Sequence, residues 1–201
     1  MKIFAIGRNY AEHAKELGNE IPEAPVIFMK PDTALLAPGA AFPYPDFSSD
    51  VHYEVEVVLR ISLGGRNIPV EEAQSHYDAI SIGIDFTARD LQAKCKAKGL
   101  PWEIAKAFDG SAAIGNFVQV PAEAEYDFSL RKNGEVCQQG NTRDMLHGCD
   151  SLIHYVSRYF TLAPGDLVYT GTPAGVGPVA VGDVLEGFLG EAKLLHCEIQ
   201  S

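Results

Sequence analysis

The stretch HYEVEVVLRISL (residues 52–63) decides the fold of this 201-residue chain, because its β-branched residues and alternating polar and apolar positions predict a strand. We expect about six to ten of these residues to be extended. Glu54 and Glu56 stand two apart, so their side chains project from one face while Val55 and Val57 point to the other. Taken alone, such a pair is better explained as the solvated face of a strand.

Asp85 ends a second apolar run, ISIGID (80–85), which is also predicted to be a strand. A lone buried carboxylate there would be costly unless it is paired, hydrogen-bonded or bound to a cation. Taken alone, Asp85 is equally explained as a cap for the helix that follows. Together with Glu54 and Glu56 it offers the oxygen ligands that suit Mg²⁺, whereas Zn²⁺ would favour His or Cys.

Two segments carry the spacing of a capping box and are predicted to form helices. In RNYAEHAKELGN (8–19) the spaced pair is Asn9 and Glu12, and in TARDLQAKCKAKG (87–99) it is Thr87 and Asp90. Suitable residues to end the helices are Gly18 and Asn19 in the first segment and Gly99 in the second.

The rest of the chain is predicted to form mainly short strands and turns. Strands are predicted at 2–7, 26–30 and near 41–44, and after residue 114 in NFVQV, FSLRKNGEVCQ, LVYTG, VLEGF and KLLHCEIQ; helices are predicted at 70–79 and 149–159. Asn133-Gly134 predicts a tight hairpin turn. Regular strand–helix–strand alternation is missing, so we expect an α+β fold rather than a doubly wound parallel sheet. The glycine-rich TGTPAGVGP (170–178) lacks the GK[ST] ending of a phosphate loop and is expected to form turns.

Composition narrows the possible partners. The formal charge is −11 and the basic residues are dispersed, which argues against nucleic acid. The four cysteines form no C-x-x-C pair, so free thiols are expected. No run reaches about 18 apolar residues and no leader pattern follows Met1, so we expect a cytoplasmic protein with no membrane partner. A negatively charged protein that binds a carboxylate substrate needs local positive charge at the binding site. A metal ion could supply that charge.

Five motifs together resemble the fumarylacetoacetate hydrolase superfamily: GRNYAEH (7–13), the E-x-E at Glu54 and Glu56, GIDFTARDLQ (83–92), GLPWEIAKAFD (99–109) and TGTPAGVG (170–177). The similarity covers nearly the whole chain and comes closest to the short acylpyruvase and oxaloacetate decarboxylase group. It implies one catalytic domain over residues 1–201, a mixed β-roll, a homodimer, and Mg²⁺ or Mn²⁺ held by Glu54, Glu56 and Asp85.

The resemblance also implies a set of pocket residues: Lys106, Gln92 and Thr172, joined by Arg8 and Lys30. A cation such as Lys106 beside a metal-bound enolate would stabilise charge that develops in the transition state, although a lysine met alone is more often a surface residue. Gln92 and Thr172 are weaker candidates, because polar residues at helix starts and turns are common for local reasons.

His13 and Glu16 lie three apart on one face of the first predicted helix, so the carboxylate can orient the imidazole. Without the resemblance, an exposed ion pair of little value would be the better explanation. With it, the pair is a candidate base for activating water, and the adjoining loop 18–25 would let this helix act as a lid. The other histidines, His52, His76, His147, His154 and His196, are expected to have structural or surface roles.

The function expected from these residues is metal-dependent hydrolysis of a carbon–carbon bond in an acylpyruvate-type 2,4-dioxo acid, which yields pyruvate and a carboxylic acid. Oxaloacetate decarboxylation needs the same enolate but no attacking water. Isomerases and hydratases of hydroxymuconate-type acids would share the carboxylates. A non-catalytic 2-oxo acid binding protein would need neither His13 nor Lys106, so their presence favours an enzyme.

Overall fold

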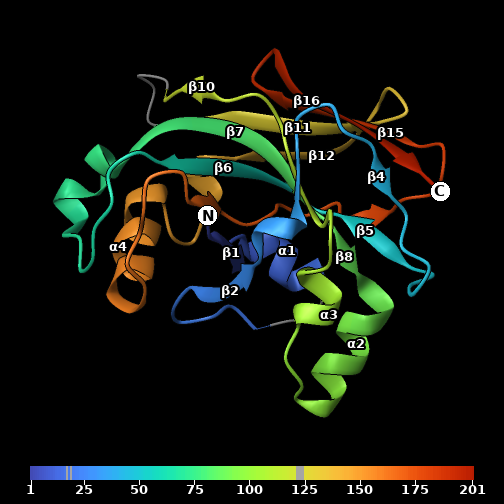
Figure 1. Ribbon diagram of the computed structural model, residues 1–201, viewed down its shortest axis with the longest axis horizontal. Coiled ribbons are helices and arrows are strands. Elements are labelled where there is room, and N and C mark those ends of the chain that lie inside the picture. The colour runs from blue at the N-terminus through green and yellow to red at the C-terminus, as the bar shows by residue number, and fades with distance from the viewer. Residues whose placement is uncertain (17, 19, 121–124) are drawn as a thin grey trace.

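The strands predicted around residues 52–63 and 80–85 form the centre of the largest sheet (Figure 1). The computed structural model of the protein describes residues 1–16, 18, 20–120 and 125–201. In it, β6 (Val55–Ile61) pairs antiparallel with β7 (Tyr77–Asp85), and Glu56 lies opposite Gly83. The single strand expected over 52–63 is divided at Glu54, because Val51–Tyr53 (β5) turns away to join a separate small sheet.

The large sheet runs in the order β2-β1-β13-β6-β7-β9-β3, with β10 beside β7. Its remaining strands are β1 (Ile3–Gly7), β2 (Val26–Lys30), β3 (Leu35–Leu36), β9 (Ala112–Ile114), β10 (Val118–Gln119) and β13 (Leu167–Tyr169). The pairs β1–β13 and β3–β9 are parallel and the others antiparallel, so the sheet is mixed.

Two further sheets complete the β-structure. One has the order β12 (Glu135–Asn141), β11 (Asp127–Lys132), β15 (Val184–Leu189), β16 (Ala192–Gln200) and β4 (Phe42–Pro43). The other joins β14 (Gly177–Pro178), β5 and β8 (Thr87–Ala88). The β11–β12 hairpin turns at Asn133 and Gly134, whose φ angles of 54° and 85° are those of the tight turn predicted from the sequence.

The two faces of β6 serve different purposes. Val55, Val57 and Leu59 are fully buried in the main hydrophobic core, which the five-stranded sheet covers with residues such as Leu130 and Leu185. Burial of each of these side chains contributes about 1.5–3 kcal/mol. The opposite face carries Val58 in a smaller apolar cluster and, further along, the carboxylates. The alternation read from the sequence therefore places the acidic residues on the face away from the main core.

Helices lie at two ends of the sheet (Figure 1). The α-helices are α1 (Ala11–Glu16), α2 (Arg89–Lys98), α3 (Glu103–Lys106) and α4 (Cys149–Tyr159), and the 3₁₀ turns are η1 (Asp32–Ala34), η2 (Val70–His76) and η3 (Thr142–Asp144). α1, α2 and α3 gather near the ends of β6 and β7, whereas α4 packs on η2. Among the described residues, no helix is long and apolar enough to cross a membrane.

Both predicted capping boxes are wrong. The side chain of Asn9 donates to the carbonyls of His147 and Thr170 and accepts from the His147 N–H, so it joins three segments instead of capping α1. α2 begins after Ala88 without a side-chain cap, and the Thr87 hydroxyl accepts from Lys106 Nζ and donates to the carbonyl of Asp85. In both cases a tertiary contact has recruited the expected capping side chain.

Other local predictions can be compared directly. Gly18 and Gly99 have positive φ angles, both 63°, and follow α1 and α2 as predicted, while Asn19 lies outside the described residues. The helix expected at 70–79 is shorter and of the 3₁₀ type, because the chain enters β7 at Tyr77. The four cysteines are free, and TGTPAGVGP forms an irregular loop with a bend at Ala174 that leads into β14.

Candidate metal and substrate site

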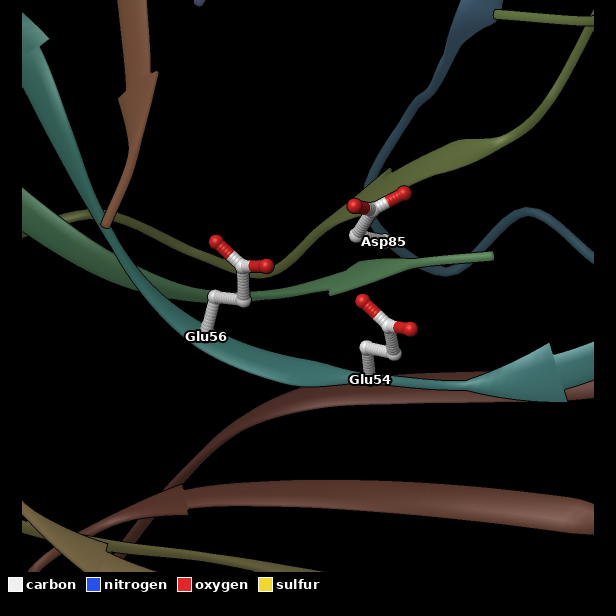
Figure 2. A group of neighbouring side chains, drawn as sticks. All are labelled: Glu54, Glu56 and Asp85. Atoms are coloured by element: carbon white, nitrogen blue, oxygen red, sulfur yellow. The ribbon is translucent and has the colours of Figure 1, made fainter. Parts of the chain in front are cut away.

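Three buried carboxylates lie close together where β6 begins and β7 finishes (Figure 2). Glu54 and Glu56 project from the same face, and Asp85 is brought beside them because its N–H donates to the carbonyl of Glu54 at 2.9 Å. The three side chains are 5%, 2% and 1% exposed, and one oxygen from each lies within 4.8 Å of the others. They form the one group of three or more acidic, His or Cys residues close enough to share a metal within the described parts of the chain.

Cations are distributed unevenly over these carboxylates. Lys106 Nζ lies 2.8 Å from Glu54 Oε2 and 2.7 Å from Asp85 Oδ2, and Arg89 Nη2 lies 2.6 Å from Glu54 Oε1. Glu56 has no salt bridge to any described residue and instead accepts the N–H of Gly171 at 2.7 Å. One carboxylate of the three therefore has no ion-pair partner in the parts of the chain that the structure describes.

The acid–base properties of the two glutamates consequently diverge. Burial alone would raise both pKa values, but the charges of Lys106 and Arg89 hold the pKa of Glu54 below its ordinary value. Burial and the neighbouring Asp85 and Glu54 charges raise the pKa of Glu56 well above its ordinary value. For Lys106, the Asp85 and Glu54 charges outweigh burial and raise its pKa, so it stays an ammonium.

The donor set fits a hard divalent cation. One oxygen from each carboxylate lies within 4.8 Å of the others, so a single cation placed among them could be reached by all three residues. Asp85 Oδ1 is buried and has no hydrogen-bond partner among the described residues; Lys30 Nζ lies 2.7 Å away in an orientation that forms an ion pair only. Glu56, which is buried and has no salt bridge to any described residue, favours a bound cation.

Lys30 lies behind the carboxylates rather than on the wall of the pocket. Its side chain is fully buried and donates to the Ser111 carbonyl at 2.8 Å, to Ser111 Oγ and to the carbonyl of Lys106. Burial lowers the pKa of Lys30 more than the Asp85 charge raises it. Through these contacts Lys30 fixes Asp85 relative to the end of α3.

A pocket of about 30 Å³ opens beside the three carboxylates. Its lining comprises Ile6, Gly7, Arg8, His13, Phe28, Glu54, Glu56, Asp85, Arg89, Gln92, Lys96, Trp102, Lys106 and Thr172. Gln92 accepts from Arg89 Nη1 at 2.8 Å, which leaves its amide N–H groups available, and Thr172 Oγ1 accepts from Gln138 Nε2 at 2.9 Å. A larger cavity of about 1020 Å³ lies beside Tyr77 and Cys149, but none of the carboxylates lines it.

His13 lines the same pocket from α1, and Glu16 holds its imidazole ring. Its Nδ1 lies 3.2 Å from Glu16 Oε2, and the Gly175 N–H donates to both oxygens of Glu16 at 3.0 and 3.2 Å. The imidazole is almost completely buried, whereas Glu16 is one-third exposed. With Nδ1 directed at a carboxylate, Nε2 is the nitrogen left to accept a proton. The other five histidines do not line this pocket.

The structure thus brings eight of the ten residues proposed from the sequence to the lining of one pocket, and it sets Glu16 behind His13 and Lys30 behind Asp85. Sequence reasoning missed Arg89, Gln138 and Lys96. Arg89 could have been found, because it stands three residues before Gln92 and so shares its helix face. Gln138 could not, because it comes from β12, about 80 residues away from the strand whose Val55 N–H it accepts at 2.9 Å.

Comparisons with known proteins identify the family of this chain. The family model for the fumarylacetoacetate (FAA) hydrolase C-terminal region matches residues 2–199. Oxaloacetate tautomerase YcgM of Escherichia coli is 43% identical over 189 residues, covering 92% of this chain and 86% of that protein. The mitochondrial oxaloacetate decarboxylase of Dictyostelium discoideum is 42% identical over 191 residues, covering 92% of this chain and 87% of that protein.

A solved structure gives the same fold. Fumarylpyruvate hydrolase from Pseudomonas aeruginosa, in complex with Mn²⁺ and pyruvate, superposes with a TM-score of 0.93 at 38% identity, covering 100% of this chain and 89% of that one. That complex and the acidic cluster of this chain both point to a divalent metal. The family match over residues 2–199, the relatives above 40% identity and the shared α+β fold lead to one conclusion: the chain is an enzyme of the fumarylacetoacetate hydrolase family.

Proposed function

We propose that the protein is a divalent-metal-dependent hydrolase that cleaves acylpyruvate-type 2,4-dioxo acids to pyruvate and a carboxylic acid. The observation that carries the proposal is the position of His13, which is oriented by Glu16 and faces the pocket of the three carboxylates. Hydrolysis needs a base to activate water, whereas binding alone does not. The solved relative with Mn²⁺ and pyruvate supports a pyruvate-forming reaction.

Glu54, Glu56 and Asp85 would hold the metal, which when bound supplies Lewis acidity toward the oxygens of a 2-oxo acid. The N–H groups of Gln92 and the hydroxyl of Thr172 line the same pocket and would hold the substrate carboxylate. Each of these two side chains is fixed by another, Arg89 or Gln138, so the substrate would be oriented by groups that are already in place.

The reaction then follows from groups of the chain. His13 Nε2 takes a proton from water, and the hydroxide formed attacks the 4-oxo carbon of the substrate. The C3–C4 bond breaks, its electron pair passes to the pyruvate enolate, and the ammonium of Lys106 stabilises the negative charge. Protonation of C3 by the His13 imidazolium completes pyruvate and restores the base.

The narrow pocket supports the proposal that α1 moves as a lid. About 30 Å³ holds no more than one or two water molecules, so a 2,4-dioxo acid can enter only if a wall moves. The side-chain link between α1 and the opposite loop runs through Glu16 and the N–H of Gly175, and this link is partly exposed. Substrate entry would separate these groups, and closure would bring His13 back to the reacting carbon.

The test of the proposed base compares two reactions in one variant. With saturating Mg²⁺ and over pH 5.5 to 9, His13→Ala is expected to lower acetylpyruvate hydrolysis by about 100-fold or more, with Glu16→Ala lowering it less. Oxaloacetate decarboxylation by the same variants should survive better, because it needs no attacking water. Equal losses in both reactions would mean that His13 closes or shapes the pocket and activates no water.

Oxaloacetate is the second candidate substrate, because the relatives at 42% and 43% identity are named as its decarboxylase and tautomerase. Tautomerisation moves a proton between C3 and the 2-oxo oxygen, so it would also use His13, whereas decarboxylation would rely on Lys106 and the metal site. A screen of acylpyruvates, oxaloacetate and hydroxymuconate-type dienoic acids separates these activities. Oxaloacetate turnover without pyruvate release from any acylpyruvate would replace the hydrolase proposal.

A further inference from the structure

Gln138 is a buried amide whose carbonyl oxygen and both N–H groups are hydrogen-bonded. Its side chain is 1% exposed and comes from β12 in the five-stranded sheet, of which no described residue lines the pocket. Oε1 accepts the Val55 N–H at 2.9 Å, and Nε2 donates to Thr172 Oγ1 at 2.9 Å and to the Pro173 carbonyl at 3.0 Å. A flipped amide would set N–H against N–H and oxygen against oxygen, so these partners determine its orientation.

The backbone of β12 places Gln138 where it can reach these groups. The pairing of β11 with β12 skips Cys137, which forms a β-bulge immediately before Gln138. Bulges change the direction of nearby side chains and are frequent beside active sites. The loop after Thr172 lies directly against this strand, since a Cβ added at Gly175 would be 2.7 Å from the Cys137 carbonyl oxygen. The short distances at Gln138 are therefore set by the packing of two backbone segments.

The strand of the metal ligands decides which end of the amide faces Thr172. The peptide group between Glu54 and Val55 is hydrogen-bonded at both edges: its carbonyl accepts the Asp85 N–H at 2.9 Å, and its N–H donates to Gln138. Such a peptide cannot rotate without leaving a buried group unpaired. Because this fixed N–H requires the oxygen of the amide, the nitrogen of Gln138 must face Thr172.

This orientation sets the direction of the Thr172 hydroxyl. A hydroxyl has one proton to donate, and it rotates to suit its partners. Because Gln138 donates to Thr172 Oγ1, the hydroxyl proton must point elsewhere, and it is donated to no group within residues 1–16, 18, 20–120 and 125–201. Thr172 lines the pocket and is 3% exposed. The remaining donor direction is therefore left for an acceptor bound in the pocket.

We infer that Gln138 is a positioning residue, which holds the Thr172 hydroxyl as a hydrogen-bond donor toward the substrate carboxylate. The inference rests on the proposed function, in which Thr172 holds that carboxylate, and it assigns the direction of this bond to a residue outside the pocket. The alternative is a purely structural role, because a buried amide with three hydrogen bonds also stabilises the fold. The Thr172 proton without an acceptor favours the positioning role, and the two roles differ in what Gln138 contributes once Thr172 has no hydroxyl.

The test is a double-mutant cycle that is read by pyruvate binding. Gln138→Met keeps the side-chain volume without the amide, Thr172→Val removes the hydroxyl, and a double variant combines them. Pyruvate is titrated calorimetrically into each protein at saturating Mg²⁺, so the measurement requires no turnover of an acylpyruvate. Asn141→Leu is the matched control, because Asn141 is another buried amide of β12, donates to Asp127 and does not line the pocket.

Thr172→Val should weaken pyruvate binding about 10-fold, as expected for the loss of one hydrogen bond to a charged group. Gln138→Met should weaken it about 5-fold, because the hydroxyl can then turn away from the pocket. The double variant should bind within about twofold of Thr172→Val, since Gln138 acts through that hydroxyl. Asn141→Leu should keep the wild-type affinity, although it and Gln138→Met both lower the free energy of unfolding by leaving buried groups unpaired.

Losses that multiply to about 50-fold in the double variant, or wild-type affinity in Gln138→Met, would show that Gln138 only stabilises the fold. If Gln138→Met does not fold, Gln138→Glu replaces it: its carboxylate accepts from Val55 but has no N–H for Thr172, and wild-type affinity in this variant would equally overturn the inference. The expected pyruvate affinities without turnover of acetylpyruvate would refute the proposed hydrolase and leave the role of Gln138 standing. Wild-type protein that binds no pyruvate would contradict both.

Discussion

At the scale of single residues, the three carboxylates are alike in the sequence but not in the structure. Glu54 and Asp85 are paired with lysine or arginine, and Glu56 accepts only a backbone N–H. The E-x-E spacing was enough to predict that two carboxylates share a face. Which of them would lack a counter-charge could not be predicted, since Arg89, Lys106 and Gly171 reach the cluster from three separate segments.

This difference predicts that metal binding releases a proton. Because the pKa of Glu56 is raised in the metal-free protein, the metal must displace its proton, so affinity should rise with pH up to that raised pKa and level off above it. Titration calorimetry of Mg²⁺ or Mn²⁺ in buffers of different ionisation enthalpy would measure the release. Glu56→Gln should bind metal weakly without this release; proton release unchanged in that variant would assign it to another group.

At the scale of elements, the sequence predicted strands better than helix starts. The β11–β12 hairpin turns at Asn133 and Gly134, a pair whose positive φ angles are a local signal that the sequence shows directly. The starts of α1 and α2 depend on where the side chains of Asn9 and Thr87 find partners, and both find them in distant segments. The resemblance to a known family predicted most of the pocket residues. Residues that only the tertiary fold brings to the site, such as Gln138, could not be predicted from the sequence.

The loop that follows β13 is predicted to be intolerant of side chains at Gly171. Its φ angle is +103°, and an added methyl group would lie 2.6 Å from Asn9 Cβ, so Gly171→Ala should cost about 2–5 kcal/mol of folding free energy. It should also weaken metal binding, because the Gly171 N–H holds Glu56. Denaturant unfolding measures the first effect.

Gly148→Ala is the matched control for this variant. Gly148 is the N-cap residue of α4, with φ −68° and nothing within 4 Å of an added Cβ, so the change should cost only about 0.5–1 kcal/mol, the amount by which Ala is a poorer N-cap than Gly. Similar free energies of unfolding for the two variants would show that the 170–172 loop can relax away from Asn9.

At the scale of the whole molecule, the packing of two sheets determines where the chemistry lies. Sequence alternation predicted that the two glutamates share the face of β6 opposite its valines, and the missing strand–helix–strand alternation predicted an α+β fold. The parallel pairing of β1 with β13 joins residues more than 160 positions apart, and no local pattern encodes it. That pairing brings Arg8 and His13, which follow β1, close to Thr172, which follows β13. The homodimer remains a prediction of the family resemblance, for which sedimentation of the protein is the direct measurement.

The central claim is that Glu54, Glu56 and Asp85 hold the divalent ion on which turnover depends. The most direct measurement titrates Mn²⁺ into metal-free protein and follows bound Mn²⁺ by electron paramagnetic resonance and pyruvate release in the same samples. Turnover should be near zero without metal and rise in proportion to about one bound Mn²⁺ per chain, and Asp85→Asn should show neither response. Full turnover by protein verified to be free of metal, or tight Mn²⁺ binding that survives in Asp85→Asn, would contradict the account.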